Sequence, residues 1–312
     1  MSKDTIVLGT RGSQLAMWQA RRVKSFLEEA GASVALQQIT TRGDQVQDVP
    51  LSEIGDEAVF TKEIDLALLR GDVDAAVHSL KDLPTTLPKG IELVAVSARA
   101  EPFDAFVAHP SVEGTLADLP DGATLATSSL RRRAQLKAWR ADLQIVPVRG
   151  NVDTRLEKLD ASTWHGMVLA AAGLQRMGLG GRIRQSIPAE IMVPAVGQGA
   201  LALTCRSEDA GRQTLLRAAM HHTATGHAAR AERAFLRRIG GGCRVPVGAW
   251  ARAKDNGHLV IDGVIAALDG TDAFRGRREV APQAAEPAGA GLADELLAQG
   301  GAEIVSAILA TR

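Results

Sequence analysis

The feature that most constrains the fold is the alternation of short apolar runs with amphipathic segments through the first two-thirds of the 312 residues. The runs TIVLG and DAAVHS have the length and branched side chains of buried strands, whereas SQLAMWQARRVKSFLEEAG has apolar residues at helical spacing and ends at Gly31. The alternation continues through strand-like ATLATSS, QIVPVRG and GMVLAAAGL, with the helical segments LRRRAQLKAWR and VDTRLEKLD between them. Because parallel strands need crossover connections, this pattern predicts α/β layers with largely parallel sheets.

The character of the sequence changes after Arg217. A helix is predicted over HHTATGHAARAERAFLRRIG, and GCRVPVGAWARA, HLVIDGVIAAL and FRGRREVA are typical of strands in a small antiparallel sheet. The segment APQAAEPAGAG predicts a surface loop, and ADELLAQGGAEIVSAIL a closing helix. This part of the chain is therefore predicted to be a separate α+β domain of about 90 residues, an ordinary domain size.

Composition limits the classes of function. Lysine plus arginine and aspartate plus glutamate both number 36, so a net charge that attracts nucleic acid is absent. Aromatic residues make up 3% with no tyrosine, which argues against base stacking. Neither a secretory leader nor a membrane-length apolar run is recognisable, so the cytoplasm is the expected location. Cys205 and Cys243 are far apart and form no metal or disulfide motif, and Cys205 is expected in the core.

Polar and basic residues gather where predicted strands give way to helices, which is the edge where open α/β sheets bind ligands. The residues there are Arg11, Ser13, Ser79, Lys81, Asp82, Ser129, Arg131, Arg132, Arg133, Arg149, Gly150, Arg155 and Arg176. Arginines at the amino end of a helix oppose the helix dipole, so three in a row at 131–133 indicate a strongly negative ligand. The alternative is a solvated helix face with ordinary ion pairs.

Asp82 is a lone carboxylate in this basic rim. An ionised carboxylate among anion receptors can stabilise a positive charge that develops during a reaction, or handle a proton together with Lys81. The alternative is an ordinary turn residue before Pro84. His221, His222 and His227 lack the spacing of a zinc enzyme, so no metal site is predicted.

The run GGGCRVPVGAW places Cys243 directly after three glycines. Glycine permits backbone conformations that other residues resist, so the thiol is expected on a tight, exposed bend rather than in a core strand. Arg244 follows it and favours the thiolate, which is the nucleophilic form of cysteine.

Eight motifs, in order along nearly the whole chain, resemble the porphobilinogen deaminase (hydroxymethylbilane synthase) family. They are LGTRGSQLA, FTKEID, AVHSLKDLP, TSSLRRRAQL, VRGNVDTRL, LAAAGLQRMG, PAVGQGAL and ERAFLRRIGGGCRVPVG. The resemblance implies an α/β fold with two lobes like type II periplasmic binding proteins and a small α+β C-terminal domain. The implied domains are residues 1–99 with 198–218, residues 100–197, and residues 219–312, the last carrying the cysteine.

The resemblance also implies a transferase of porphyrin and heme biosynthesis. Such an enzyme condenses four porphobilinogen molecules head to tail into the tetrapyrrole hydroxymethylbilane and releases ammonia at each addition. It is primed on a dipyrromethane cofactor, which the resemblance places on Cys243 through a thioether. The family expectation is a cytoplasmic monomer that binds this small-molecule substrate and neither nucleic acid nor membrane.

Residue roles follow from the resemblance position by position. Asp82 would be the catalytic carboxylate, with Lys81 beside it. The implied cofactor-binding residues are Lys62, Ser79, Asp82, Ser129, Arg131, Arg132, Arg149 and Gly150. The implied substrate-binding residues are Arg11, Ser13, Arg149, Arg155 and Arg176. Arg133 is expected to be structural or to face solvent.

The sequence departs from the family at Glu57, where a lysine of a mobile loop is commonly found. This departure predicts normal chemistry with altered behaviour of the loop. From the residues alone, two other classes stay open: a non-enzymatic two-lobed receptor for a polycarboxylate, and transfer of a phosphate ligand. The receptor has no use for Cys243 in its glycine turn, and the second class lacks a glycine-rich phosphate loop.

Overall fold

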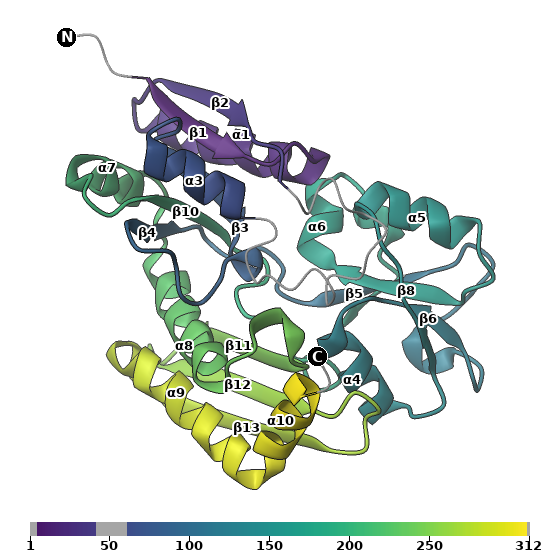
Figure 1. Cartoon of the computed structure of the whole chain (residues 1–312). Helices are drawn as coiled ribbons and strands as arrows, with labels where there is room; N and C mark the ends of the chain where they lie inside the picture. The colour runs from purple at the N-terminus through teal and green to yellow at the C-terminus, as the bar shows by residue number, and fades with distance from the viewer. Residues whose placement is uncertain (1–4, 42–60, 311–312) are drawn as a thin grey trace. The chain divides into compact units, whose positions relative to one another are not determined.

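The computed structural model describes residues 5–41 and 61–310 of the chain (Figure 1). The chain divides into two compact units. The first unit comprises Met1–Ala100 with Ala200–Gly226, and the second comprises Glu101–Gly199 with His227–Arg312. The chain therefore crosses from one unit to the other more than once. In the described ranges, no helix combines the length and apolar character needed to cross a membrane.

The first unit is built on a five-stranded sheet in the order β2-β1-β3-β10-β4. Its strands are β1 (Ile6–Thr10), β2 (Val34–Gln38), β3 (Ala75–Ser79), β4 (Ile91–Val96) and β10 (Leu201–Arg206). Only β10 runs antiparallel to its neighbours among the pairings of this sheet. The prediction of a largely parallel α/β sheet is confirmed here.

Helices cover both faces of this first sheet: α1 (Gln14–Glu29), α3 (Lys62–Arg70) and α7 (Ala210–Met220). Val77 packs in a cluster with residues of α1 and α7, whereas Ala76 packs with α3. Since adjacent strand residues point to opposite faces, the apolar run of β3 is buried on both sides. Cys205 of β10 is fully buried, as predicted, and burial raises the pKa of its thiol to about 11.

The second unit contains a sheet of the same design, in the order β7-β6-β8-β5-β9. Its strands are β5 (Asp104–Ala108), β6 (Thr124–Ala126), β7 (Gln144–Val146), β8 (Gly166–Ala170) and β9 (Gln185–Ile187), and β5 is the antiparallel strand. The helices of this part are α4 (Leu130–Trp139), α5 (Val152–Asp160) and α6 (Ala171–Arg176), with 3-10 turns at Leu116–Asp118 and Gly180–Arg182. The reversed strand is thus fourth in both five-stranded sheets.

The second unit also holds the C-terminal antiparallel sheet, which was predicted from the sequence. It consists of β11 (Val247–Ala253), β12 (Leu259–Ala266) and β13 (Ala273–Val280). Three helices accompany it: α8 (Thr223–Ile239), α9 (Ala285–Leu296) and α10 (Ala302–Ala310) (Figure 1). Phe235 of α8, Ile261 of β12 and Leu292 of α9 share one buried cluster, so these elements form a common core.

Three expectations about the elements are wrong. Residues 281–291, predicted as a loop, form the 3-10 turn Pro282–Ala284 and the first seven residues of α9. The predicted strand over 166–174 ends at Ala170 and continues as α6. The closing helix is two helices, because the backbone leaves helical geometry at Gly300 between α9 and α10.

The reason for the missed part of α9 is close packing. A Cβ placed on Gly289 would lie 1.9 Å from the carbonyl oxygen of Ala231 in α8. The glycine therefore allows the two helix backbones to approach where any side chain would clash. A glycine- and alanine-rich composition suggested a loop, yet here it serves helix–helix contact.

Candidate functional site

At the carboxyl ends of β1 and β3, the first unit carries the predicted residues Arg11, Ser13 and Ser79. These strands pair in parallel, so the loops that follow them lie at one edge of the sheet. Ser13 is the N-cap of α1, and its hydroxyl accepts a hydrogen bond from Ala16 N at 3.3 Å. Gln19 Nε2 of α1 donates to Ser79 Oγ at 2.8 Å and ties the helix to the second loop.

Lys81 and Asp82 lie in the 3-10 turn Leu80–Asp82 directly after β3. Leu80 and Leu83 are buried on either side of them, and Leu80 N donates to Ala200 O at 3.0 Å. The Asp82 side chain is exposed between these two anchors. The turn thus holds the carboxylate in place by its backbone.

His78 immediately precedes this loop and is buried. Its Nε2 lies 3.2 Å from the hydroxyl of Thr204 on the neighbouring strand β10. Burial, with a smaller contribution from the positive charge of Arg11, lowers the pKa of His78 to about 4. The ring is therefore neutral at physiological pH and serves to join two strands beneath the loop.

The carboxyl edge of the second unit is formed by the loops after β6, β7 and β8, which pair in parallel. Ser128 Oγ links two of these loops, since it donates to Val148 O at 2.7 Å and accepts from Val148 N at 3.0 Å. Ser129 is the N-cap of α4 and accepts from Arg132 N. Arg155 Nε donates to Gly150 O at 2.7 Å, so the side chain of the helix fixes the glycine before it.

Arg149 carries a buried nitrogen with unused hydrogen-bonding capacity. Its Nη1 is buried without a hydrogen-bond partner in the structure as described. Buried polar atoms are nearly always hydrogen-bonded, and a cationic donor left alone is costly. The guanidinium of Arg149 is therefore suited to an anionic ligand at this edge.

Arg131 and Arg132 are 6% and 7% exposed, and both bind the carboxylate of Asp104, which is fully buried. These ion pairs within the chain agree with the alternative weighed from the sequence, and an additional anionic ligand for this turn stays a prediction. Asp104, at the start of β5, provides a negative group within the chain. Arg133 is exposed, as predicted. Binding of cofactor by Arg131 and Arg132 stays a prediction.

Arg176 and Lys62 occupy different units. Arg176, the last residue of α6, donates from Nη2 to Gly199 O at 2.7 Å. Burial lowers the pKa of its guanidinium to about 10, so it remains charged near neutral pH. Lys62 is the exposed first residue of α3 in the first unit. Its predicted contact with cofactor is not tested by the geometry.

The glycines before Cys243 form the tight bend predicted from the sequence. Gly240, Gly241 and Gly242 have φ angles of 79°, 75° and 52°, in the left-handed region that favours glycine. Cys243 lies in the 3-10 turn Gly242–Arg244, and the buried Val245 follows it. The side chain of Cys243 lies outside the described part of the structure, as does Glu57.

Two buried residues of the second unit were missed at the sequence level. Asp104 begins an otherwise apolar strand, and Gln198 Nε2 donates to its Oδ1 at 3.1 Å. A polar residue inside the run DAFVA was a usable signal for Asp104, because an uncompensated charge is not tolerated there. No group of histidine, cysteine and acidic side chains that could hold a metal ion occurs within 5–41 and 61–310.

These observations define a class: an α/β protein with two sheets of matching strand order, one carrying an exposed acid and the other an arginine cluster, and a glycine-held cysteine before a third sheet. Two family models match it. Residues 6–214 match the porphobilinogen deaminase dipyrromethane cofactor-binding domain, and residues 227–298 match the porphobilinogen deaminase C-terminal domain. The chain belongs to the porphobilinogen deaminase family, and it is a transferase of tetrapyrrole biosynthesis.

Relatives agree over nearly the full length. The porphobilinogen deaminase of Syntrophomonas wolfei is 49% identical over 300 residues, covering 96% of this chain and 97% of the relative. That of Desulforudis audaxviator is 47% identical over 307 residues, with 98% of each covered. The resemblance seen in the sequence motifs is thereby confirmed, and the first family model also confirms a dipyrromethane cofactor.

Solved structures give a more distant likeness. The methionine-binding protein MetQ is 14% identical with a TM-score of 0.43, covering 70% of this chain and 90% of its own. The amino-acid transporter binding protein YtmK of Bacillus subtilis is 10% identical with a TM-score of 0.43, covering 68% and 88%. At this level of similarity, the ligands of these proteins carry no argument about the present chain.

Proposed function

We propose that this chain joins four porphobilinogen molecules head to tail into hydroxymethylbilane and releases one ammonia with each addition. Water then releases the linear tetrapyrrole from the cofactor, and the dipyrromethane stays bound to the protein. A dipyrromethane bound to Cys243 through a thioether supplies the primer on which the chain of pyrroles grows. The family assignment supports the reaction class, and the residue roles proposed below are those that the family resemblance implies, with the geometry that supports each given beside it.

The orphaned Nη1 of Arg149 carries this proposal. Porphobilinogen has acetate and propionate arms, so a growing oligomer accumulates carboxylates. A guanidinium binds a carboxylate through charge-assisted hydrogen bonds. Arg149 has such a donor at the carboxyl edge of the second sheet, where it is buried with no partner in the part of the chain that the structure describes. The site therefore fits a polycarboxylate cofactor, and Gly150, whose carbonyl is held by Arg155, belongs to the same loop.

Asp82 is assigned the catalytic carboxylate, with Lys81 beside it. Loss of ammonia leaves an electron-poor pyrrole carbon, and an ionised carboxylate stabilises the positive charge that develops. Departure of ammonia also requires a proton on the leaving amine, which Lys81 can supply or relay. The exposed position of Asp82 on an anchored turn supports these roles.

The remaining residues are assigned to binding. Cofactor contacts are proposed for Lys62, Ser79, Ser129, Arg131, Arg132, Arg149 and Gly150, and substrate contacts for Arg11, Ser13, Arg149, Arg155 and Arg176. Two of the serines also cap helices, which places their hydroxyls at the amino ends of α1 and α4, where anions are favoured.

The wider assignment concerns organisation and location. We take the protein to be a cytoplasmic monomer, with functional domains at residues 1–99 with 198–218, residues 100–197 and residues 219–312. Size-exclusion chromatography with light scattering tests the monomer, and cell fractionation tests the location. A dimer or an exported protein would contradict these assignments.

Intact-mass spectrometry tests the covalent cofactor. Wild-type protein should exceed its sequence mass by one dipyrromethane, and Cys243→Ser should show the sequence mass and no activity. Cys205→Ala is the matched control and should retain the added mass, because Cys205 is buried in β10 and its thiol pKa is raised to about 11. A fully active wild-type protein with only its sequence mass would contradict the proposal.

A further inference from the structure

A single carboxylate in the second unit serves two guanidinium groups. Arg131 donates from Nη1 to Asp104 Oδ2 at 2.7 Å and from Nη2 to Oδ1 at 3.1 Å. Arg132 donates from Nε to the same Oδ1 at 2.9 Å, and its Nη2 lies 2.7 Å from that oxygen. All three groups are buried, so the cluster holds one net positive charge inside the protein.

Backbone carbonyls hold the outer ends of both arginines. Arg131 Nη1 also donates to Val193 O at 2.9 Å, and Arg132 Nη1 donates to Val168 O at 2.8 Å. Each guanidinium plane is therefore fixed at two points, the carboxylate of Asp104 and a carbonyl. Because a guanidinium donates in a rigid, planar fork, fixing the plane also fixes the directions in which its remaining N–H groups point.

Gln198 holds the carboxylate of Asp104 from the other side. Its Nε2 donates to Asp104 Oδ1 at 3.1 Å and to Pro102 O at 2.8 Å. Gln198 lies in the crossover segment 193–199, and its two neighbours, Gly197 and Gly199, are each held by a hydrogen bond. Gly197 N donates at 2.7 Å to Glu232 of α8, and Gly199 O accepts from Arg176.

Glu232 itself is fully buried and bridges two elements. Its second oxygen accepts from Ala251 N of β11 at 2.7 Å. The segment that carries Gln198 is thereby attached to the C-terminal sheet. A continuous chain of contacts leads from Glu232 through Gln198 and Asp104 to the arginine pair.

We propose that Asp104 is a positioning residue for Arg131 and Arg132, and that Gln198 supports it. Asp104 aligns the two guanidinium planes and reduces their combined charge, so that the pair presents one net positive charge to a carboxylate of the bound oligomer. The inference rests on the proposed function, because it takes Arg131 and Arg132 to bind such a carboxylate.

Two effects of removing the Asp104 charge have opposite signs. If Asp104 only lowered the local charge, Asp104→Asn would raise it by one and strengthen carboxylate binding. If Asp104 positions the arginines, the same change releases their planes and weakens binding, although the site becomes more positive. The direction of the change in KM therefore separates positioning from simple charge balance.

The experiment compares Asp104→Asn with Asp262→Asn. Asp262 also pairs with two arginines, Arg252 and Arg277, but both lie in the C-terminal sheet and neither is among the predicted binding residues. Two quantities are measured: KM and kcat for porphobilinogen, and the fraction of protein that carries the added mass. Thermal unfolding of each variant is recorded as well.

Asp104→Asn should raise KM about tenfold, with a smaller change in kcat, and should lower the loaded fraction. Asp262→Asn should lower the unfolding temperature while KM and the loaded fraction stay at the wild-type values. An unchanged or lower KM in Asp104→Asn, with normal loading, overturns the positioning role.

Gln198→Met provides a second measurement, because loss of the Asp104 charge in a buried site can prevent folding. This variant keeps all three charges of the cluster and removes the hydrogen bonds from Gln198 to Asp104 and to Pro102 O, so KM should rise severalfold with the fold intact. A wild-type KM in a folded Gln198→Met protein overturns the role of Gln198. If Asp104→Asn does not fold, the same result also overturns the positioning role of Asp104. Wild-type protein without added mass would contradict the proposed function; a loaded wild-type protein with unaffected variants contradicts only the positioning role.

Discussion

The two five-stranded sheets share one strand order but carry opposite chemistry at their carboxyl edges. In the first unit the edge carries the exposed carboxylate of Asp82 above a buried, neutral His78. In the second unit it carries buried arginines that share the carboxylate of Asp104, together with Arg149, whose Nη1 has no hydrogen-bond partner among the described residues. Strand order determines where loops meet, and the loop residues determine the reaction that can occur there.

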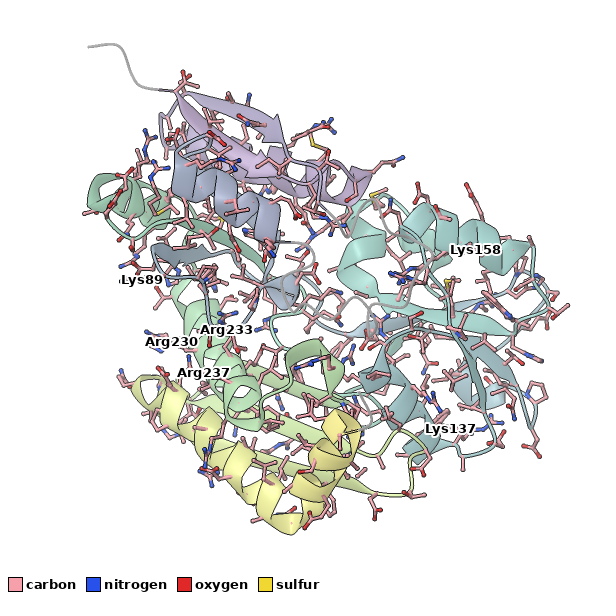
Figure 2. The ribbon with its side chains drawn as sticks, viewed as in Figure 1. Lys89, Lys137, Lys158, Arg230, Arg233 and Arg237 are labelled. Carbon is pink, nitrogen blue, oxygen red and sulfur yellow. The ribbon has the colours of Figure 1, made fainter. Side chains whose placement is uncertain are left out.

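Cationic side chains outside the proposed site occur in both units, and Figure 2 labels Lys89 in the first. Figure 2 labels Lys137 and Lys158 on the second unit, along with Arg230, Arg233 and Arg237 of α8. Arg237 pairs with Glu286 of α9, and burial lowers the pKa of Arg233 to about 10. Positive charge alone therefore does not identify a binding site.

The largest effect is expected from the acid of the first unit. Asp82→Asn removes the negative charge and keeps the side-chain size, so kcat should fall by about a hundredfold to ten-thousandfold while cofactor mass is retained. Steady-state kinetics and intact mass are the measurements. Asp72→Asn, an exposed aspartate of the same unit, is the control and should keep the wild-type kcat. Near-normal turnover in Asp82→Asn would remove Asp82 from the mechanism.

The buried histidine makes the first unit sensitive to acid. The pKa of His78 is about 4 when folded, below its ordinary 6.5, so the unfolded chain binds more protons between these pH values. The His78 contribution to the free energy of unfolding is thus present above pH 6.5 and declines as the pH falls towards 4, by roughly 3 kcal/mol in total.

Urea-unfolding midpoints at pH 7.5 and pH 5 measure this effect. The difference between the two midpoints should be smaller in His78→Gln than in wild type, because glutamine cannot bind the proton. His258→Gln, which changes an exposed histidine of the C-terminal part, should keep the wild-type difference. Equal differences in wild type and His78→Gln would show that another group senses the acid.

Arg149 of the second unit should contribute to substrate affinity rather than to the folding stability of the protein. Arg149→Met keeps the length of the side chain and removes the donor, so KM should rise about tenfold with little loss of folding free energy. The control is Arg182→Met, which breaks only the Arg182–Asp160 pair outside the proposed site. If KM stays constant while thermal stability falls, Arg149 is a structural residue.

The smallest effect is expected from the two serine N-caps, Ser13 of α1 in the first unit and Ser129 of α4 in the second. Ser13→Ala and Ser129→Ala should each lower the free energy of unfolding by about 1 kcal/mol, because each removes the cap of a long helix. Ser→Asn at the same positions should restore stability. Recovery of KM along with stability would assign these serines to capping alone, and a KM that stays raised would support direct contact with ligand.

The sequence predicted much of the site because its residues follow strands. Arg11, Lys81 and Arg149 lie directly after apolar runs, so periodicity alone placed them at sheet edges, and the family motifs added their roles. The sequence did not identify Asp104 and Gln198, because their importance depends on contacts with residues far along the chain. The partner of Arg131 lies 27 positions away in sequence, on a strand of opposite direction.

The sequence by itself determined the alternation of strands and helices, the glycine bend before Cys243 and the family. These are local properties, set by side-chain period, by backbone freedom and by short motifs. Tertiary structure alone decided that Arg131 and Arg132 share a buried aspartate, that Arg149 Nη1 is buried without a partner in the described ranges, and that residues 285–291 are helical against α8. Burial and charge pairing arise only when distant segments come together, and no local pattern encodes them.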